Sequence, residues 1–359
     1  MTYSKPLLII GNGARGLDWT KFGIPIVTTR LGIDLIESSN PLFAGRYGLF
    51  TDTPSYLAVK NADYVICVGA RLDPGFAGYN FKDFALQAYI QIVDCDLKEL
   101  KKFPPAGLDS KSPTLVGCYA DTYYKEFFKR TPPFKITDWL DQIHAWQKKY
   151  PLKLTGSYKV IREISDQATK DDIIVVDTSS SFHIAAQMWQ IKKGQRYITT
   201  GGISTMGYWP AAIGAALASG RRVICITGDG CLQMNIQELA TVVKNKLNIK
   251  IFVLNNDGYL LIRHTQKKYF NRLGGESPKT GLGFPDLEKI AEAYDIRYVN
   301  ARDRFRERGP IGDKRLKEVI TEVLQGRDPI LCEIKTPKWE KMQCRLDELS
   351  KDTILTAIS

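Results

Sequence analysis

The chain contains no apolar run near the roughly 18 residues that a helix needs to cross a bilayer. Its opening residues, 1–6, lack the basic flank, apolar stretch and small-residue cleavage site of a secretory signal peptide. Internal repeats and low-complexity segments are absent too. These absences predict a cytoplasmic protein with no membrane partner.

The cysteines show no pairing pattern. The seven are odd in number, form no CxxC motif and mostly lie inside apolar, strand-like runs, so we expect reduced core thiols. The length of 359 residues, with 44% hydrophobic and 25% charged residues, is typical of a globular chain of about two domains.

A formal net charge of +11 would suit a polyanionic partner, which raises nucleic-acid binding as a hypothesis. The densest basic stretches, at 266–272 and 297–308, are interleaved with acids or aromatics. They match no helix-turn-helix, zinc-finger or RNA-binding signature. The sequence therefore predicts a solvated basic surface and no nucleic-acid partner.

Short β-rich runs alternate with helical patterns along the chain, which is typical of parallel sheets with βαβ crossovers. The pattern predicts an α/β fold with two doubly wound parallel-sheet domains. The strand candidates are 7–10, 24–28, 64–68 and 90–93 in the first domain, and 173–176, 223–227, 249–254 and 330–334 in the second.

Linker signals separate the two domains. Segment 101–112 is rich in Pro, Gly and Lys, and a second break follows at 131–133. An amphipathic helix is predicted at 138–149. The expected organisation is a first domain at 1–135, a linker helix at 136–155, a second domain at 156–345 and a tail at 346–359.

A G-x-G-x-x-G motif, Gly11 to Gly16, directly follows the first strand candidate. A nicotinamide-binding unit also needs an acid after its second strand, where this sequence has Thr29 and Arg30. Glycines at such a position also serve a tight turn. Both interpretations stay open, and the motif alone does not establish a nicotinamide-dependent oxidoreductase.

Polar residues follow two strand candidates of the second domain. The sequence GDG, centred on Asp229, follows the run at 223–227, and the sequence NNDG, with Asn256 second, follows the run at 249–254. Because the carboxyl ends of adjacent parallel strands meet at one edge, these side chains are expected to converge. A carboxylate, an amide and a backbone carbonyl suit Mg²⁺ completed by phosphate oxygens and water. Amides at the next helix start would hold a diphosphate.

At these residues the sequence resembles the thiamine-diphosphate-dependent enzymes, whose signature is Gly-Asp-Gly followed by Asn-Asn. The segments GGISTMGYWPAAIGAA and NNDGYLLIRHTQKKYF look like acetolactate-synthase-like proteins. The earlier segments IPIVTTRLG, NADYVICVGARLD and IQIVDCD look like that family's central domain. The resemblance implies a central Rossmann-like domain followed by the diphosphate-binding domain, with thiamine diphosphate and Mg²⁺ as cofactors.

The resemblance implies a role for each matching position. Asp229, Asn256 and the carbonyl of Gly258 would hold Mg²⁺. Met206 would be the apolar wedge that bends the cofactor, although without the surrounding motif an ordinary core residue is the preferred interpretation. The carbonyl of Ser204 would accept a hydrogen bond from the aminopyrimidine. The remaining cofactor contacts would be Ser180, Ser181, Gly228, Gly230, Cys231 and Tyr259.

Members of this family carry a pyrimidine-binding domain before the central one, and it supplies the glutamate that protonates the aminopyrimidine. No glutamate of this sequence matches that role, so no residue is assigned as the catalytic acid. We expect a C-terminal fragment, a truncated chain or half of a split enzyme. The chain alone is expected to be inactive, with the missing domain supplied in cis or in trans.

The implied activity is decarboxylation of a 2-keto acid, with pyruvate first, and transfer of the acyl carbanion to a carbonyl acceptor. A homodimer or larger homo-oligomer is implied. Thr265 stands where branched-chain acetolactate synthases have a tryptophan that selects the larger keto acid. Trp209 is expected to crowd the cofactor loop. His264 is either a proton shuttle or a helix-surface residue. Alternatives are a non-catalytic or split-subunit cofactor-binding module, and a carboligase acting on a nucleotide-linked keto-sugar.

FAD is a further possible cofactor, because the central domain of acetolactate synthases binds it. Gly69, Ala70, Arg71 and Asp94 match positions near that cofactor, whereas Gly75 stands where an arginine is usual. A working FAD site and a vestigial site that only packs stay open.

Overall fold

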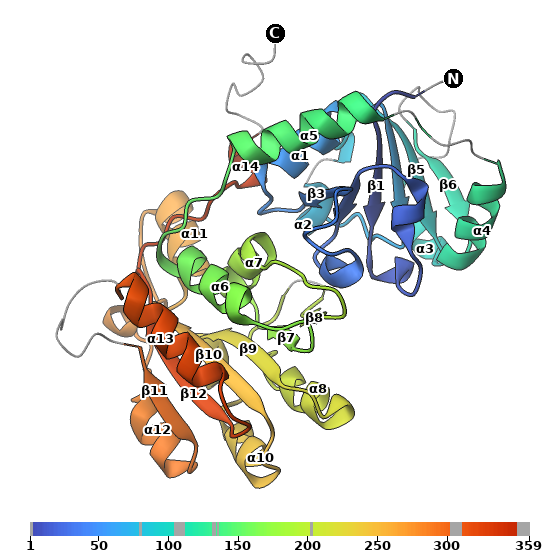
Figure 1. Cartoon of the computed structure of the whole chain (residues 1–359). Helices are drawn as coiled ribbons and strands as arrows, with labels where there is room; N and C mark the ends of the chain where they lie inside the picture. The colour runs from blue at the N-terminus through green and yellow to red at the C-terminus, as the bar shows by residue number, and fades with distance from the viewer. Residues whose placement is uncertain are drawn as a thin grey trace. The chain divides into compact units, whose positions relative to one another are not determined.

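A computed structural model describes residues 3–78, 81–103, 112–130, 134, 136–201, 204–301 and 311–349. They form two compact units (Figure 1). The first unit contains the chain up to Leu152 and the segment from Gln343, and the second runs from Lys153 to Met342. Each is built on a six-stranded parallel sheet, which confirms the predicted fold class.

The first sheet has the strand order β3-β2-β1-β4-β5-β6. Alternate residues of β1 enter two separate cores, Leu7 and Ile9 on one face and Leu8 and Ile10 on the other. Burial on both faces explains the continuous apolar runs of β1 and β4. The strands are β1 (Pro6–Ile10), β2 (Ile26–Thr28), β3 (Phe43–Arg46), β4 (Tyr64–Val68), β5 (Tyr89–Asp94) and β6 (Thr114–Gly117).

Helices cover both faces of this sheet. Residues of α4 (Ala120–Arg130) belong to the core that contains Leu8 and Ile10. The core on the opposite face contains residues of α1 (Thr53–Asn61), α2 (Pro74–Ala77), α3 (Leu97–Leu100), α5 (Thr137–Lys149) and α14 (Leu346–Leu349). Helix α1 begins where the Asp52 side chain accepts the Ser55 N–H at 2.7 Å.

The unit boundaries differ from the expected domains at two places. The predicted linker helix is α5, which buries Trp139, Ile143 and Trp146 in the core of the first unit. The chain also returns to the first unit at Gln343, where Leu346 and Leu349 pack into the same core. Apolar side chains therefore attach both segments to one unit. Residues 350–359 of the expected tail lie outside the described residues.

The second sheet has the strand order β11-β12-β10-β9-β7-β8. Its four interior strands are mostly apolar and almost fully buried, as expected for parallel strands covered on both faces. The strands are β7 (Ile173–Val176), β8 (Arg196–Thr199), β9 (Val223–Gly228), β10 (Ile249–Asn255), β11 (Arg297–Asn300) and β12 (Ile330–Lys335).

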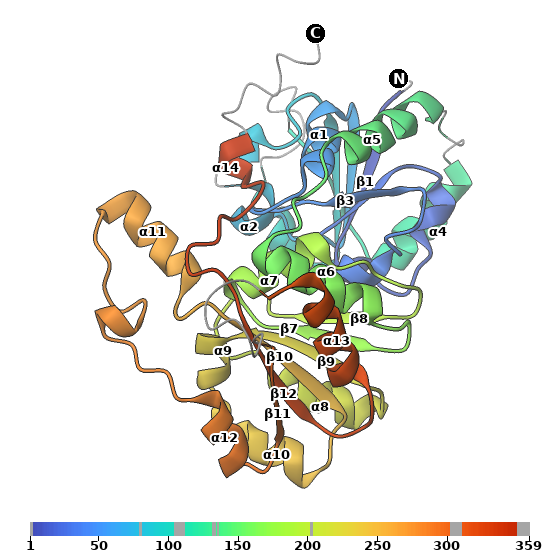
Figure 2. The ribbon, with the colours of Figure 1, turned by 60° about the vertical axis from the view of Figure 1, so that its left-hand side comes forward.

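The helices of the second unit form two layers around this sheet (Figures 1 and 2). One layer contains α6 (Gly156–Gln167), α7 (Ser179–Met188) and α13 (Asp313–Leu324). The other contains α8 (Ala211–Ser219), α10 (Leu239–Lys244) and α12 (Leu287–Ala293), whose apolar residues share one core with the strands. The short helix α9 (Asp229–Gln233) and α11 (Leu260–Phe270) follow β9 and β10.

No helix within the described ranges is long and apolar enough to span a membrane. All seven cysteines are free thiols. Cys67, Cys225, Cys231 and Cys332 are buried, as expected of core thiols, but the expectation is wrong for Cys95, which is exposed.

Candidate functional site

The candidate site lies at the carboxyl ends of three neighbouring strands, β7, β9 and β10. The chain leaves β7 toward β8 on one side and later builds β9 and β10 on the other. The sheet therefore has a topological switch point between β7 and β9, which is where open α/β sheets bind ligands. The segments beginning at Asp177, Gly228 and Asn255 all leave the sheet at this edge.

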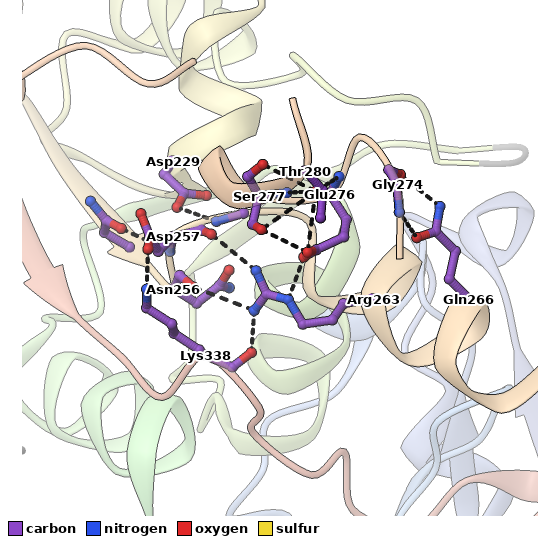
Figure 3. A network of polar contacts seen from close by, with 12 residues as sticks. Asp229, Asn256, Asp257, Arg263, Gln266, Gly274, Glu276, Ser277, Thr280 and Lys338 are labelled. Carbon is purple, nitrogen blue, oxygen red and sulfur yellow. Dashed lines mark hydrogen bonds and ion pairs between the residues drawn. The ribbon is translucent and has the colours of Figure 1, made fainter. Parts of the chain in front are cut away.

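Asp229 begins α9, and its carboxylate joins the segments after β9 and β10. Oδ1 accepts the Gly230 N–H at 2.8 Å, and Oδ2 accepts the Gly258 N–H at 3.0 Å (Figure 3). The residue is only 6% exposed. Burial raises the pKa of this carboxyl to about 6, although the backbone N–H groups act in the opposite direction. No basic side chain of the described residues forms an ion pair with it.

The loop after β10 brings the second predicted ligand to the same place. Asn256 is 6% exposed, and its side-chain oxygen Oδ1 is buried with no hydrogen-bond partner. The neighbouring Asn255 shapes the loop, because its Oδ1 accepts the Asp257 N–H at 3.0 Å and its Nδ2 donates to Glu333 Oε1 at 2.6 Å. A buried oxygen without a donor is costly, unless a cation or donor supplies what it lacks.

Gly230 lies where three segments converge. A Cβ at this position would overlap the Tyr259 ring and lie 3.2 Å from the Met206 methyl carbon. A side chain at this position would clash with them. Glycine therefore lets the start of α9, the Tyr259 ring after β10 and Met206 pack closely together.

Asp177 holds the 204–209 loop. Its fully buried carboxylate accepts the Tyr208 and Trp209 N–H groups, each at 3.0 Å, and the Thr227 hydroxyl at 3.2 Å. Asn235, two residues after α9, adds a donation to the Gly207 carbonyl at 2.7 Å. The Met206 segment is therefore fixed to the sheet by buried polar contacts.

The first turn of α7 completes the edge. Ser179 has a φ of +67°, which is uncommon for a residue other than glycine, and begins the helix directly after β7. Ser180 and Ser181 are buried in that turn. The Ser181 hydroxyl oxygen lies 3.7 Å from the position of a Cβ at Gly228. The start of α7 therefore faces the turn after β9.

Two family models match this chain. The C-terminal TPP binding domain of thiamine pyrophosphate enzymes matches residues 177–334, which include the whole candidate site. The central domain of thiamine pyrophosphate enzymes matches residues 2–109. The chain belongs to the thiamine pyrophosphate enzyme family. This confirms the family inferred from the Asp229 and Asn256 motifs.

The curated relatives of this chain include acetolactate synthase large subunits. That of Cyanidium caldarium is 32% identical over 318 residues, which cover 86% of this chain and 52% of the relative. Isozyme 2 of Escherichia coli is 28% identical over 84% of this chain and 56% of its own length. Acetolactate synthase 1 of Zea mays, a chloroplastic protein, is 27% identical over 94% and 54%. The chain thus spans about half the length of the curated relatives it matches.

The structure brings most of the predicted site residues together. Asp229 contacts Gly258, and Gly230 lies against Tyr259 and Met206. Gly228 lies near Ser181 and Cys231, and Asn256 shares the loop of Gly258. Ser180 lies in the same helical turn as Ser181, and Ser204 lies in the Met206 loop.

Two backbone groups that were expected to contact the cofactor already take part in hydrogen bonds within the protein. The Gly230 amide, expected to be free for a diphosphate, donates to Asp229. The Ser204 carbonyl, expected to accept from the aminopyrimidine, accepts the Thr178 hydroxyl at 2.7 Å. A carbonyl oxygen has two lone pairs, so it retains capacity for a second donor. Ser204 also has a φ of +64°, which places this carbonyl in a constrained turn.

Three substrate-related expectations have different outcomes. The Trp209 side chain is fully buried in the core that contains α8, so it packs inside the unit instead of crowding the loop. Thr265 is exposed on α11. The His264 Nε2 atom lies 2.9 Å from the Glu340 carbonyl, and its ring contacts Trp339. His264 therefore has a structural partner on the segment after β12.

In the first unit, the loops after β1 and β4 pack directly against each other at that sheet's switch point. A Cβ at Gly11 would overlap the Gly69 carbonyl, and Gly13 N–H donates to that carbonyl at 3.0 Å. The short 3₁₀ turn η1 (Asn12–Ala14) comes directly after β1, in the place of an α-helix. The glycines thus serve close backbone packing, and the helix that a dinucleotide motif should open is replaced by this turn.

The residues matched to FAD positions have partners within the first unit. Arg71 pairs with Glu99 at 3.4 Å, and Asp94 accepts the Asp96 N–H at 2.8 Å. A Cβ at Gly75 would lie 3.0 Å from the Arg30 guanidinium, which pairs with Asp73. Any side chain at position 75 would therefore crowd Arg30 and Asp73 at its Cβ.

Sequence reasoning missed several residues that hold the site. Asp177 directly follows an apolar strand run, the same signal that identified Asp229, so its position gave a usable clue. Arg263, Glu276 and Glu333 gave no such signal, because their partners are distant in the sequence.

Proposed function

We propose that this chain corresponds to the C-terminal portion of a thiamine-diphosphate- and Mg²⁺-dependent, acetolactate-synthase-like enzyme. Such an enzyme would decarboxylate a 2-keto acid, with pyruvate as the first candidate, and transfer the acyl unit to a carbonyl acceptor. The observation that supports this most strongly is the buried, unpartnered oxygen of Asn256, in the loop that Gly258 joins to the Asp229 carboxylate.

The donor set fits Mg²⁺ bound together with a diphosphate. Asp229 would supply a carboxylate oxygen, Asn256 its amide oxygen and Gly258 its carbonyl, all of them the hard ligands that Mg²⁺ prefers. Among the described residues, no three His, Cys, Asp or Glu side chains are grouped as a metal site. The protein alone therefore offers few ligands, and cofactor phosphate oxygens would complete the shell. We expect Mg²⁺ and the diphosphate to bind together.

The protein's other contributions are shape and hydrogen bonding. Met206 and Tyr259, which both lie against Gly230, would contact the cofactor body, and the turns containing Ser180, Ser181, Gly228 and Cys231 would face its diphosphate. Ser204 would offer its carbonyl to the aminopyrimidine. When bound, thiamine diphosphate supplies a nucleophilic carbon that also stores the electrons released by decarboxylation.

Among the described residues, we match no glutamate to the acid that the family uses on the aminopyrimidine. We therefore assign that acid to a pyrimidine-binding domain, on the same polypeptide or on another, in a homo-oligomer. The 359-residue chain alone is expected to bind the cofactor without releasing CO₂ from pyruvate. A non-catalytic cofactor-binding module and a carboligase for a nucleotide-linked keto-sugar are the alternative functions. FAD remains a separate proposal for the first unit, tested below.

Titration calorimetry tests the cofactor site. Thiamine diphosphate should bind the chain in Mg²⁺ and lose most of its affinity in excess chelator. Asp229→Ala should abolish the Mg²⁺-dependent part, because it removes the anionic ligand. Asp286→Ala, which removes an exposed helix-capping carboxylate of the same unit, is the matched control and should bind as the wild type does. Equal binding by Asp229→Ala and wild type would refute the assignment.

A further inference from the structure

The loop that carries Asn256 and Gly258 needs external support. Asp257 has a φ of +61° and Gly258 a φ of +143°, so the loop includes a left-handed residue with a side chain. Such a conformation persists only where surrounding contacts impose it. The contacts of the following helix, α11, supply that constraint.

Arg263, on α11, donates to the carbonyls of this loop. Its Nη2 donates to the Asp257 carbonyl at 3.0 Å, and its Nη1 donates to the Asn256 carbonyl at 3.5 Å and to the Lys338 carbonyl (Figure 3). The guanidinium side chain is 3% exposed. A planar fork with several donors can fix backbone carbonyls of two segments at once, which a lysine cannot do.

Glu276 orients Arg263 and balances its charge. Its Oε2 accepts Arg263 Nε at 2.5 Å, and its Oε1 accepts the Ser277 hydroxyl at 2.6 Å and the Thr280 hydroxyl at 3.3 Å. The Glu276 carbonyl also accepts the Tyr259 N–H at 2.8 Å. The pair thus holds both ends of the loop. A buried guanidinium without this partner would repel a cation bound nearby.

The fit between the loop and the pair is close. A Cβ at Gly258 would overlap both the Glu276 carbonyl oxygen and Arg263 Nη2. A shift of the pair would therefore move the Gly258 backbone, which carries one expected ligand and donates to another, Asp229.

We propose that Arg263 and Glu276 are positioning residues for the divalent cation site, an inference that rests on the proposed function. They touch neither the metal ligands' side-chain oxygens nor the cofactor in this assignment. They fix the backbone that presents Asn256 and Gly258, and they do so as a neutral pair. Loss of the pair therefore weakens the binding of Mg²⁺ more than it weakens the binding of the diphosphate.

The test is the Mg²⁺ concentration that half-saturates thiamine diphosphate binding, measured by calorimetry on the full chain. Arg263→Lys keeps the charge opposite Glu276 but loses the fork, and it should raise this concentration about 10- to 100-fold, the usual effect of removing a group that orients metal ligands. Thiamine diphosphate affinity at saturating Mg²⁺ should change much less.

Arg222→Lys is the matched control. Arg222 forms a comparable ion pair with Asp172, at 2.7 Å, but precedes β9 at the opposite end of the same sheet. The Arg222→Lys variant should have the same Mg²⁺ requirement as the wild type. Glu276→Gln, the second variant, keeps an acceptor for Arg263 but leaves its charge uncompensated, and it should also raise the requirement.

The possible outcomes separate the two proposals. An unchanged Mg²⁺ requirement in both Arg263→Lys and Glu276→Gln overturns the positioning role. An equal rise in Arg222→Lys overturns it as well, because the effect would then be general destabilisation. Wild-type chain that shows no Mg²⁺-dependent binding overturns the proposed function itself, and the positioning role with it.

Discussion

The ionised Asp229 carboxylate destabilises the folded chain, so the contribution of this residue to stability depends on pH. Its folded pKa is about 6, above the ordinary 3.8, so the folded state binds its proton more tightly than the unfolded state does. The stability that this carboxyl contributes is complete below about pH 4 and is lost as the pH rises through 6. A shift of about two pKa units corresponds to about 3 kcal/mol as an upper figure.

Urea unfolding of the cofactor-free chain checks this. The stability of wild type relative to Asp229→Ala should fall by up to about 3 kcal/mol between pH 4 and pH 7.5. Losses of stability in the variant that do not depend on pH, such as those from unsatisfied N–H groups, cancel when the two pH values are compared. Mg²⁺ with thiamine diphosphate should restore wild type at pH 7.5, because the cation compensates the buried charge. A pH-independent difference would contradict the raised pKa.

Among single residues, the sequence predicted those site residues that directly follow apolar strands. Asp229 and Asn256 could be placed at one sheet edge because each comes directly after such a run. Arg263 could not be linked to the site, because its partners Glu276 and Lys338 lie 13 and 75 positions away. Long-range hydrogen bonds leave no periodic signal, so the residues that support a site are harder to predict than those that form it.

Among elements, Asp177 connects β7 to the loop that carries Met206. Asp177→Asn replaces one acceptor oxygen by an amino group that faces buried donors, so we expect a destabilisation of about 1–3 kcal/mol. The displaced loop should also weaken thiamine diphosphate binding at saturating Mg²⁺. Urea unfolding and calorimetry measure the two effects.

Thr178→Val is the control for this loop, because it removes the donation from the Thr178 hydroxyl to the Ser204 carbonyl and leaves Asp177 in place. It should destabilise the unit less than Asp177→Asn does. If Asp177→Asn lowers stability but leaves cofactor affinity unchanged, the carboxylate supports the fold without positioning the loop.

The strands that the sequence did not predict are the outer strands of both sheets. β3, β6, β8 and β11 have the sequences FAGR, TLVG, RYIT and RYVN, which are short and mixed. Interior strands such as β10, IKIFVLN, are buried on both faces and therefore read as apolar runs. An outer strand has one free edge and less burial, so composition identifies it poorly.

In the whole molecule, two sheets of similar architecture have different switch points. The order β3-β2-β1-β4-β5-β6 places the first switch point between β1 and β4, where Gly11, Gly13 and Gly69 bring two backbones into contact. At the second, Asp177 and Asp229 follow adjacent strands and buried polar groups gather instead. Fold class alone predicted a ligand at either place, and the residues after the strands favour the second.

This asymmetry predicts how ligands stabilise the chain. Each unit has its own apolar core, so a ligand held within one unit should raise the unfolding temperature of that unit. At about 100 times its Kd, Mg²⁺–thiamine diphosphate should contribute about 2.7 kcal/mol, or about 5–10 °C for a unit of this size. Scanning calorimetry of wild type and Asp229→Ala, with and without the cofactor, measures the shift.

FAD added to the same scans tests the first unit. If the contact between the loops of Gly11 and Gly69 fills the switch point, FAD should move no transition, whereas a working flavin site should raise the unfolding temperature of the first unit. Asp229→Ala should respond to FAD as wild type does in either case, because the two sites would belong to different units. An FAD-induced shift would therefore show that the close glycine contact leaves room for a nucleotide elsewhere on the first sheet.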